Sequence, residues 1–474
     1  MSIGKSFLWS ALERFSIQII QFVIGIVLAR LLDPSEYGII GVILVINSFL
    51  QIFIDSGFTK ALIQKQNRTV DDFNSVFIFN VGIGVLCYIL LFFCSPIVEN
   101  FYSIPNLALY IKVVGLSLII NSLYAVIQTD LSIKLDFKSM AKVNLFSSLI
   151  SGIIAIILAY FGYGIWALIG QIILKSLFTL IAFVCIKKYT MKFSYSHNSI
   201  VELYKFGSNI LYSSLLNNIV NNFSTIFIAK IYDVKSVGYY TRGTQFTDVV
   251  FNTFSSIQDS VLLPIFSKFS NNIEGVKKEF LKVYKYSTLF LLPVFLLLSL
   301  LAEPIIKLLL TDKWLMAVPI MQIFAIARFI TILSGININV LYALGYSRLV
   351  LNQQIFKIII RVSFLIIAIP FGIYYVAIAE LISTIVHYFI NSYYPGKILK
   401  YSGIYQLQSS SKIFFGSLSF VIIHFFIKIF SDSQYTIIFG TTFIGMLLYI
   451  IFLKIFKVEE IKIINRIFNN KIKL

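Results

Sequence analysis

The fold is decided by residues 28–42, LARLLDPSEYGIIGV, which join two long apolar segments through a turn of a few polar residues. The upstream segment, residues 9–32, is long enough at about 1.5 Å per residue to cross a hydrocarbon core about 30 Å thick. It nevertheless carries Glu13, Arg14, Gln18 and Gln21. Such groups cost free energy in lipid unless they face protein or water. The stretch therefore predicts a bundle of membrane-spanning helices with a polar interior.

The composition is also that of a membrane protein. The chain of 474 residues is 58% hydrophobic and only 13% charged, whereas about 25% of the residues are charged in soluble proteins. Its net charge of +18 would suggest nucleic acid in a soluble protein. Here the positive residues lie at helix ends and in alternate loops, which indicates a topology signal and contact with anionic lipids. We therefore expect membrane lipids, and no nucleic acid, as partners.

Apolar runs separated by turn signals predict about fourteen membrane-spanning helices and an all-α integral membrane fold. The first six cover about residues 9–32, 38–62, 74–98, 107–130, 140–160 and 163–186. The next six cover about residues 201–231, 241–267, 284–310, 316–345, 350–371 and 373–398, and the last two about 409–430 and 434–457. We expect an N-terminal lobe (1–199), a C-terminal lobe (200–400) and two further helices with a cytoplasmic tail (401–474).

The distribution of Lys and Arg predicts the orientation. With both termini inside, the inner segments hold basic clusters such as Lys134, Lys138 and Lys142, and the C-terminal tail holds another. The outer loops hold few basic residues, mainly Lys230, Lys235, Arg242 and Lys313. The positive-inside rule therefore favours cytoplasmic N- and C-termini.

The chain contains an internal repeat. Leu28–Gly38 reads LARLLDPSEYG and Ile228–Gly238 reads IAKIYDVKSVG, with Ala, Asp and Gly in the same places. Upstream, Gln18 and Gln21 correspond to Asn218 and Asn221 at the same offset. Both segments follow the first helix of a proposed six-helix half, so the two lobes are expected to be parallel repeats around a central cavity.

No catalytic signature is present. The sequence has no GxxxxGK[ST] loop, no HExxH and no CxxC arrangement, so we expect neither an enzyme nor a bound metal or cofactor. The histidines His197, His387 and His424 are dispersed and are interpreted as packing or interfacial residues. A membrane glycosyltransferase or polymerase is the alternative from another class. It would need a large loop for its donor or acceptor, and the predicted outer loops are short.

Charged residues inside the predicted spans are the candidate site. The basic ones are Arg14, Lys175, Arg328 and Arg361, and the acidic ones are Asp55, Asp248, Asp259 and Glu380. A charge at the bilayer centre costs about 2.5–3.5 kcal/mol on insertion scales, so each needs a partner or a hydrated cavity. One hypothesis is a cationic cavity that binds a phosphate or acidic sugar, with Asp55, Asp259 and Glu380 in ion coupling or gating. The other is structural ion pairs, such as Glu13 with Arg14 or Asp55 with Lys60.

Amide side chains are the candidate polar lining. Gln18, Gln21, Asn218 and Asn221 lie within spans, and Asn217/Asn221 and Asn218/Asn222 are four residues apart on one helix face. Amides suit sugar hydroxyls because they both donate and accept hydrogen bonds. They also join helices in membranes, and the sequence leaves both roles open.

These segments carry a family resemblance. Residues 13–41 (ERFSIQIIQFVIGIVLARLLDPSEYGIIG) and 55–73 (DSGFTKALIQKQNRTVDDF) resemble the opening of polysaccharide flippases of the Wzx type. Residues 228–243 (IAKIYDVKSVGYYTRG), 302–314 (AEPIIKLLLTDKW) and 336–348 (ININVLYALGYSR) resemble later landmarks of that family. These proteins belong to the multidrug/oligosaccharidyl-lipid/polysaccharide superfamily.

The resemblance implies alternating access in the bacterial cytoplasmic membrane. The implied cargo is an undecaprenyl-pyrophosphate-linked oligosaccharide that moves to the outer leaflet for surface polysaccharide, such as O-antigen. Polysaccharide polymerase and assembly proteins are further candidate partners. The resemblance also implies that positive cavity residues meet the pyrophosphate or acidic sugars. An ion-coupled multidrug exporter of the same superfamily remains the alternative, although a positive cavity repels cationic drugs.

Overall fold

The computed structural model describes residues 3–55, 58–65, 67–186, 195–269 and 271–460. Several side chains within these ranges are not described, among them those of Arg14, Lys60, Asn217 and Asp259. The chain divides into two compact units, Met1–Thr241 and Arg242–Leu474. The predicted lobes, with their boundary at residue 199/200, follow the sequence repeat rather than the packing, and they stay a prediction.

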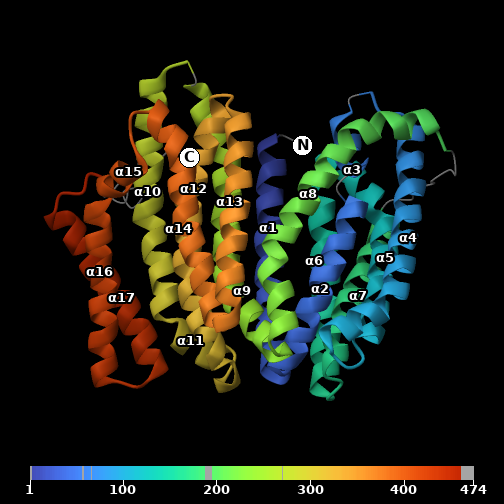
Figure 1. The fold of residues 1–474 in the computed structure, drawn as a ribbon, viewed down its shortest axis with the longest axis horizontal. Helices are drawn as coiled ribbons and strands as arrows, with labels where there is room; N and C mark the ends of the chain where they lie inside the picture. Colours follow the sequence, from blue (N-terminus) through green and yellow to red (C-terminus); the bar gives the residue numbers. More distant parts are fainter. Residues whose placement is uncertain (1–2, 56–57, 66, 187–194, 270, 461–474) are drawn as a thin grey trace. The chain divides into compact units, whose positions relative to one another are not determined.

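Helices make up both units (Figure 1). The first unit holds α1 (Ile3–Leu31), α2 (Pro34–Asp55), α3 (Phe58–Gln64), α4 (Val70–Tyr102), α5 (Leu107–Ile133), α6 (Phe137–Tyr160), α7 (Ile165–Ile186) and α8 (His197–Ile231). α9 (Val234–Lys268) begins in the first unit and continues in the second. The second unit then holds α10 (Ile273–Leu300), α11 (Ala302–Leu309), η1 (Asp312–Ala317), α12 (Val318–Ala343), α13 (Ser347–Ala368), η2 (Ile369–Phe371), α14 (Ile373–Ile398), α15 (Gly403–Ser409), α16 (Ser411–Phe430) and α17 (Gln434–Ile455).

The all-α membrane fold is confirmed. Among the described residues, twelve helices are long and apolar enough to cross a membrane. α1 and α8 are not among the twelve: the described apolar part of α1, Ser16–Leu31, is shorter than a full span, and α8 contains polar residues such as Asn218, Asn221 and Asn222. The predicted count of fourteen spans is therefore not confirmed.

Two predicted spans have different bounds in the structure. In the span predicted at 38–62 the described residues form α2 and α3, and residues 56 and 57 between them lie outside the described part of the chain. The span predicted at 284–310 is divided into α10 and α11. α10 begins at Ile273, where the backbone N–H of Gly275 donates to the Asn272 side chain (3.1 Å). Its first turns are rich in Lys and Glu, yet Val276, Phe280 and Tyr284 follow at four-residue spacing and are fully buried. An amphipathic helix therefore occupies what looked like a polar connection.

The internal repeat appears in the helix boundaries. α1 ends at Leu31 and α2 begins at Pro34; α8 ends at Ile231 and α9 begins at Val234, the same places 200 residues later. In the second copy the Asp233 carboxylate accepts a hydrogen bond from the backbone N–H of Ser236 (2.9 Å), as an N-cap residue does. Equivalent residues therefore begin the second helix of each repeat.

The last two long helices pack against each other and onto α10 in the second unit (Figure 1). The Tyr449 hydroxyl donates to the Leu289 carbonyl (3.0 Å), and Phe420 and Leu453 are fully buried there. A separate core joins α9, α10, α12 and α14 around Phe280, Phe295 and Ile336. α16 and α17 thus pack within the second unit, and their place outside a six-helix repeat stays a prediction.

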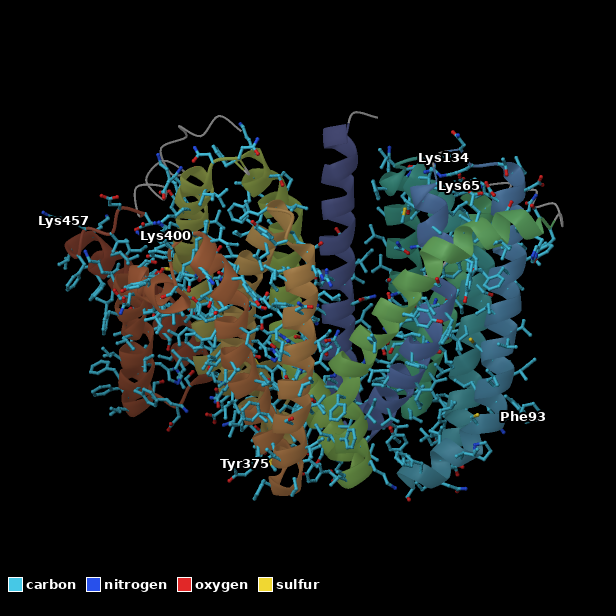
Figure 2. All side chains as sticks on the ribbon, turned by 45° about the horizontal axis from the view of Figure 1, so that its top comes forward. Lys65, Phe93, Lys134, Tyr375, Lys400 and Lys457 are labelled. Carbon is cyan, nitrogen blue, oxygen red and sulfur yellow. The ribbon has the colours of Figure 1, made fainter. Side chains whose placement is uncertain are left out.

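The labelled lysines of each unit lie together, away from the labelled aromatic residue. In Figure 2, Lys65 and Lys134 lie at one end of the first unit, and Phe93 lies toward its other end. In the second unit, Lys400 and Lys457 lie well away from Tyr375. This separation agrees with the positive-inside pattern of the sequence. Which end faces the cytoplasm stays a prediction.

Candidate functional site

One face of α2 carries a polar ladder. Asn47, Gln51 and Asp55 are spaced four residues apart and so share a helix face. The Gln51 amide nitrogen donates to the Asp55 carboxylate (2.9 Å), and Asn47 donates to Ser117 Oγ on α5 (3.4 Å). An apolar helix with this spacing presents hydrogen-bonding groups in a line along its axis.

The ladder continues onto α5. Asn121 Nδ2 donates to Gln51 Oε1 (2.9 Å), and the Tyr124 hydroxyl donates to Asn121 Oδ1 (2.9 Å). Asp55, predicted to act in ion coupling, is exposed and lies at one end of this chain of hydrogen bonds. Sequence reasoning missed Gln51, Asn121 and Tyr124, although the four-residue spacing of Asn47, Gln51 and Asp55 was a usable signal.

The structure describes all four residues of the predicted amide lining, and their role as a lining stays a prediction. Asn218 on α8 donates to Ser48 Oγ on α2 (3.3 Å), and Asn222 donates to Asn218 Oδ1 (3.2 Å). Gln18 is half-buried, whereas Gln21 and Asn221 are exposed. Asn218 thus joins α8 to the helix that carries the polar ladder.

Lys175 lies near the middle of α7 and is half-buried. Among the described residues, its ammonium forms no ion pair and no hydrogen bond with another side chain. A cation in the middle of a membrane helix needs a counter-charge or water. Of the three predicted basic site residues whose side chains the structure describes, Lys175 is the one without an ion pair.

Arg328 and Arg361 form ion pairs in the second unit. Arg328 Nε on α12 lies 2.6 Å from Asp248 Oδ1 on α9, and the guanidinium lies against the rings of Phe251 and Phe324. Arg361 on α13 binds Glu380 on α14 through Nη2 (2.8 Å). Both arginines therefore form ion pairs within the second unit, and their role in a cationic cavity stays a prediction.

Other predicted residues lie outside the described side chains. These are Arg14 with Glu13, Asp259, and Lys60 as the suggested partner of Asp55. Their roles stay predictions.

Lys65 forms two ion pairs that sequence reasoning missed. Located between α3 and α4, it forms ion pairs with Asp72 (3.0 Å) and with Glu202 on α8 (2.8 Å). The hydrogen bond to Glu202 is the largest influence on Lys65 and raises its pKa. The residue therefore stays charged and holds the end of α8 to the α3–α4 connection.

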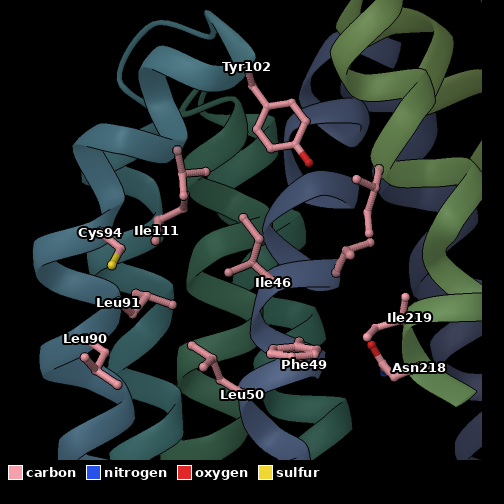
Figure 3. A pocket seen from close by; sticks show the side chains of 13 residues that line it. Ile46, Phe49, Leu50, Leu90, Leu91, Cys94, Tyr102, Ile111, Asn218 and Ile219 are labelled. Carbon is pink, nitrogen blue, oxygen red and sulfur yellow. The ribbon is translucent and has the colours of Figure 1, made fainter. Parts of the chain in front are cut away.

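A cavity of about 350 Å³ lies within the first unit (Figure 3). Its walls are almost wholly apolar and come from α2, α4, α5 and α8, with Phe49, Leu90 and Ile219 among them. Asn218 and Tyr102 contribute polar groups at different ends (Figure 3). Such a lining does not suit a hydroxylated glycan, which needs many hydrogen-bond partners.

Buried amides in the second unit have a structural role. Asn337 and Gln406 donate to each other's side-chain oxygens (3.1 and 3.0 Å), and both residues are fully buried. The Tyr388 hydroxyl donates to the same Gln406 oxygen (3.1 Å). For Asn337 the structure thus favours the helix-joining role over sugar binding.

A family model described as polysaccharide biosynthesis protein matches residues 27–319, which is more than half of the chain. The chain belongs to this family. The resemblance seen in the sequence is confirmed, and the protein is a multi-pass membrane protein of a polysaccharide biosynthesis and transport family.

Individual relatives agree with the family. The teichuronic acid biosynthesis protein TuaB of Bacillus subtilis is 26% identical over 71% of this chain and 70% of its own length. The succinoglycan biosynthesis transport protein ExoT of Rhizobium meliloti is 25% identical over 68% of this chain and 65% of its own. The lipopolysaccharide biosynthesis protein WzxC of Escherichia coli is 23% identical over 67% and 65%, respectively.

Solved structures share the fold. The lipid II flippase MurJ, in an inward closed conformation, covers 96% of this chain with a TM-score of 0.76 at 18% identity, and all of MurJ is covered. An inward-facing multidrug resistance transporter of the MATE family covers 82% of this chain with a TM-score of 0.62 at 14% identity, and 99% of it is covered. At these identities the likeness describes the fold alone.

Proposed function

We propose that this protein is a flippase for undecaprenyl-pyrophosphate-linked oligosaccharides. In this proposal it moves the repeat unit from the inner to the outer leaflet of the bacterial cytoplasmic membrane, for surface polysaccharide biosynthesis. Both termini lie in the cytoplasm, and the polar interior opens to each side in turn. The protein catalyses no covalent step; its partners are the lipid-linked oligosaccharide, membrane lipids, and polymerase and assembly proteins.

The observation that carries the proposal is the polar ladder of Asn47, Gln51 and Asp55 within a membrane-spanning helix. Gln51 of this ladder donates to Asp55 and accepts from Asn121, and Asn121 in turn accepts from the Tyr124 hydroxyl. Sugar hydroxyls exchange hydrogen bonds with amides and carboxylates, so a hydrated glycan can replace water along such a line at little cost. A protein that only anchors other proteins has no need of this line.

The charged end of the cargo requires a cation. A pyrophosphate inside a membrane protein is stabilised by Lys or Arg. In the proposal Lys175 meets it in the first unit, because its ammonium has no counter-charge among the described residues. Arg14, Arg328 and Arg361 are further contacts in this proposal. To bind the cargo, Arg328 would have to release Asp248, and Arg361 would have to release Glu380.

Export of cationic drugs is the second candidate, because a multidrug resistance transporter of the MATE family shares the fold. Coupling to ions through Asp55, Asp259 or Glu380 belongs to both functions. The uncompensated Lys175 favours an anionic cargo, since it would repel a drug cation.

A deletion strain tests the proposal. We expect surface polysaccharide to be lost while complete lipid-linked repeat units accumulate, and mass spectrometry of these lipids then gives the glycan. Truncated or absent lipid-linked units would place the protein in synthesis instead. Normal polysaccharide in a strain without other flippase genes would contradict the proposal.

A further inference from the structure

α13 and α14 form an antiparallel seam in the second unit with three successive polar contacts. Gln353 Nε2 donates to the Ile390 carbonyl, His387 Nε2 donates to the Lys357 carbonyl (2.9 Å), and Arg361 binds Glu380 (2.8 Å). Gln353, Lys357 and Arg361 are spaced four residues apart, so their side chains share one face of α13.

This seam has more positive than negative charge. Glu380 is 4% exposed and bound to Arg361, so its carboxylate is already used. Lys357 is only 8% exposed, and its ammonium forms no ion pair or hydrogen bond within the described part of the chain. The His387 ring lies at the same seam, with Nε2 2.9 Å from the Lys357 carbonyl oxygen. The ring donates through Nε2 and supplies no negative charge.

An uncompensated ammonium at this depth is unfavourable. A lysine at a membrane centre costs free energy on insertion, and so does a buried charge without a partner in a protein interior. Sequence reasoning missed Lys357, because the predicted span 350–371 places it among the first residues. A lysine at that position resembles other basic residues near helix ends. The structure buries it beside a second cation.

We propose that Lys357 and Arg361 form an anion site that takes a phosphate-type oxyanion. An ammonium offers three donors and a guanidinium five, which suits the several oxygens of a phosphate group. Arg361 retains 20% side-chain exposure, which gives the anion a way in. One source is the pyrophosphate of the cargo, an assignment that rests on the function proposed above. The other is free inorganic phosphate or pyrophosphate.

The test uses the full-length protein in lipid nanodiscs, with thermal unfolding followed at constant ionic strength in gluconate buffer. A ligand that binds only the folded state raises the melting temperature as its concentration increases, and the increase reveals its affinity. The probes are sodium pyrophosphate and, separately, polyprenyl pyrophosphate incorporated into the nanodisc. The variants are Lys357→Gln, Lys357→Arg and, as matched control, Arg348→Gln, which removes an exposed cation from the same helix.

We expect saturable stabilisation of the wild type, Lys357→Arg and Arg348→Gln, and binding weakened about tenfold or more in Lys357→Gln, since one charge-assisted contact is lost. Without the anion, Lys357→Gln should melt no lower than the wild type, because it removes an uncompensated charge. Stabilisation by inorganic pyrophosphate identifies a free anion, and stabilisation by the polyprenyl compound alone identifies the carrier lipid.

Two results would overturn the site. One is an equal increase in the melting temperature of Lys357→Gln and of the wild type on addition of the probe; the other is no saturable increase in the wild type with either probe. Both results are independent of the deletion strain. If the strain contradicts the flippase proposal while inorganic pyrophosphate still binds through Lys357, the anion site stands and only the cargo assignment is lost.

Discussion

Gly38 and Gly238 occupy equivalent places in the internal repeat and make equivalent contacts with each other's segments. A Cβ atom at Gly38 would lie 1.8 Å from the carbonyl oxygen of Val234, and one at Gly238 would lie 2.0 Å from the carbonyl oxygen of Pro34. Pro34 and Val234 are themselves equivalent, 200 residues apart. The first turns of α2 and α9 thus cross as a nearly symmetric pair, with backbone against backbone. Only glycine allows this approach.

Substitution of these glycines should open the crossing. We expect Gly38→Val and Gly238→Val each to lower the melting temperature by several degrees and to reduce polysaccharide export, because a backbone carbonyl cannot move aside as a side chain can. Gly82→Ala is the control, since nothing lies within 4 Å of a Cβ atom at that position. Unchanged melting of both valine variants would mean that the crossing is not a tight contact.

Removal of the uncompensated charge in the first unit tests the cationic contact. Lys175→Gln should lower polysaccharide export by about tenfold, as expected for loss of one charge-assisted contact, while the amount of protein in the membrane stays normal. Lys142→Gln, which removes an exposed lysine from α6, is the control. Normal export by Lys175→Gln would argue against a role for this ammonium in cargo binding.

The Arg328–Asp248 pair allows structural and functional roles to be separated. Arg328→Ala alone leaves Asp248 without its partner, so it should lower stability. We expect Arg328→Ala/Asp248→Ala to regain part of that loss, with a coupling of about 1 kcal/mol, because both groups are partly exposed. If Arg328 also meets cargo, export stays low in the double variant. Export restored together with stability would assign the arginine a structural role only.

Glu303 connects α11 to α16 through charge. Lys307 and Lys428 lie 2.8 and 2.9 Å from its carboxylate and lower its pKa from 4.5 to about 2. A lowered pKa gives stability that is present above the unfolded value and is lost as the pH falls toward 2. The difference in melting temperature between wild type and Glu303→Gln should therefore be constant above about pH 5 and should shrink as the pH falls from about 4.5 toward 2. A difference that stays the same between pH 5 and pH 3 would contradict the lowered pKa.

The repeat and most spans could be predicted from the sequence because their signals are local. Apolar runs and the matching segments at Leu28–Gly38 and Ile228–Gly238 depend on neighbours along the chain. The start of α10 could not be found in the same way, since a lysine-rich amphipathic turn resembles a loop until its burial partners are known. The hydropathy of a window does not reveal which face of a helix is covered.

The site was harder to predict, because charge compensation is a property of pairs. Arg328 and Arg361 were expected as cavity cations, yet each meets a carboxylate from a helix distant in the sequence. Conversely, Lys357 was not predicted as a site residue, and the structure buries it without a counter-charge among the described residues. No spacing rule within one helix gives this information; it requires knowledge of which helices are neighbours.

The sidedness of the lipid-linked oligosaccharide is the measurement that tests the central claim most directly. Protoplasts of the wild type and the deletion strain would be treated with a membrane-impermeant glycosidase, and the remaining lipid-linked oligosaccharide would be quantified by mass spectrometry. We predict that the enzyme digests a substantial share in the wild type and almost none in the deletion strain until the membranes are opened. Equal digestion in both strains would mean that this protein does not carry the oligosaccharide across the membrane.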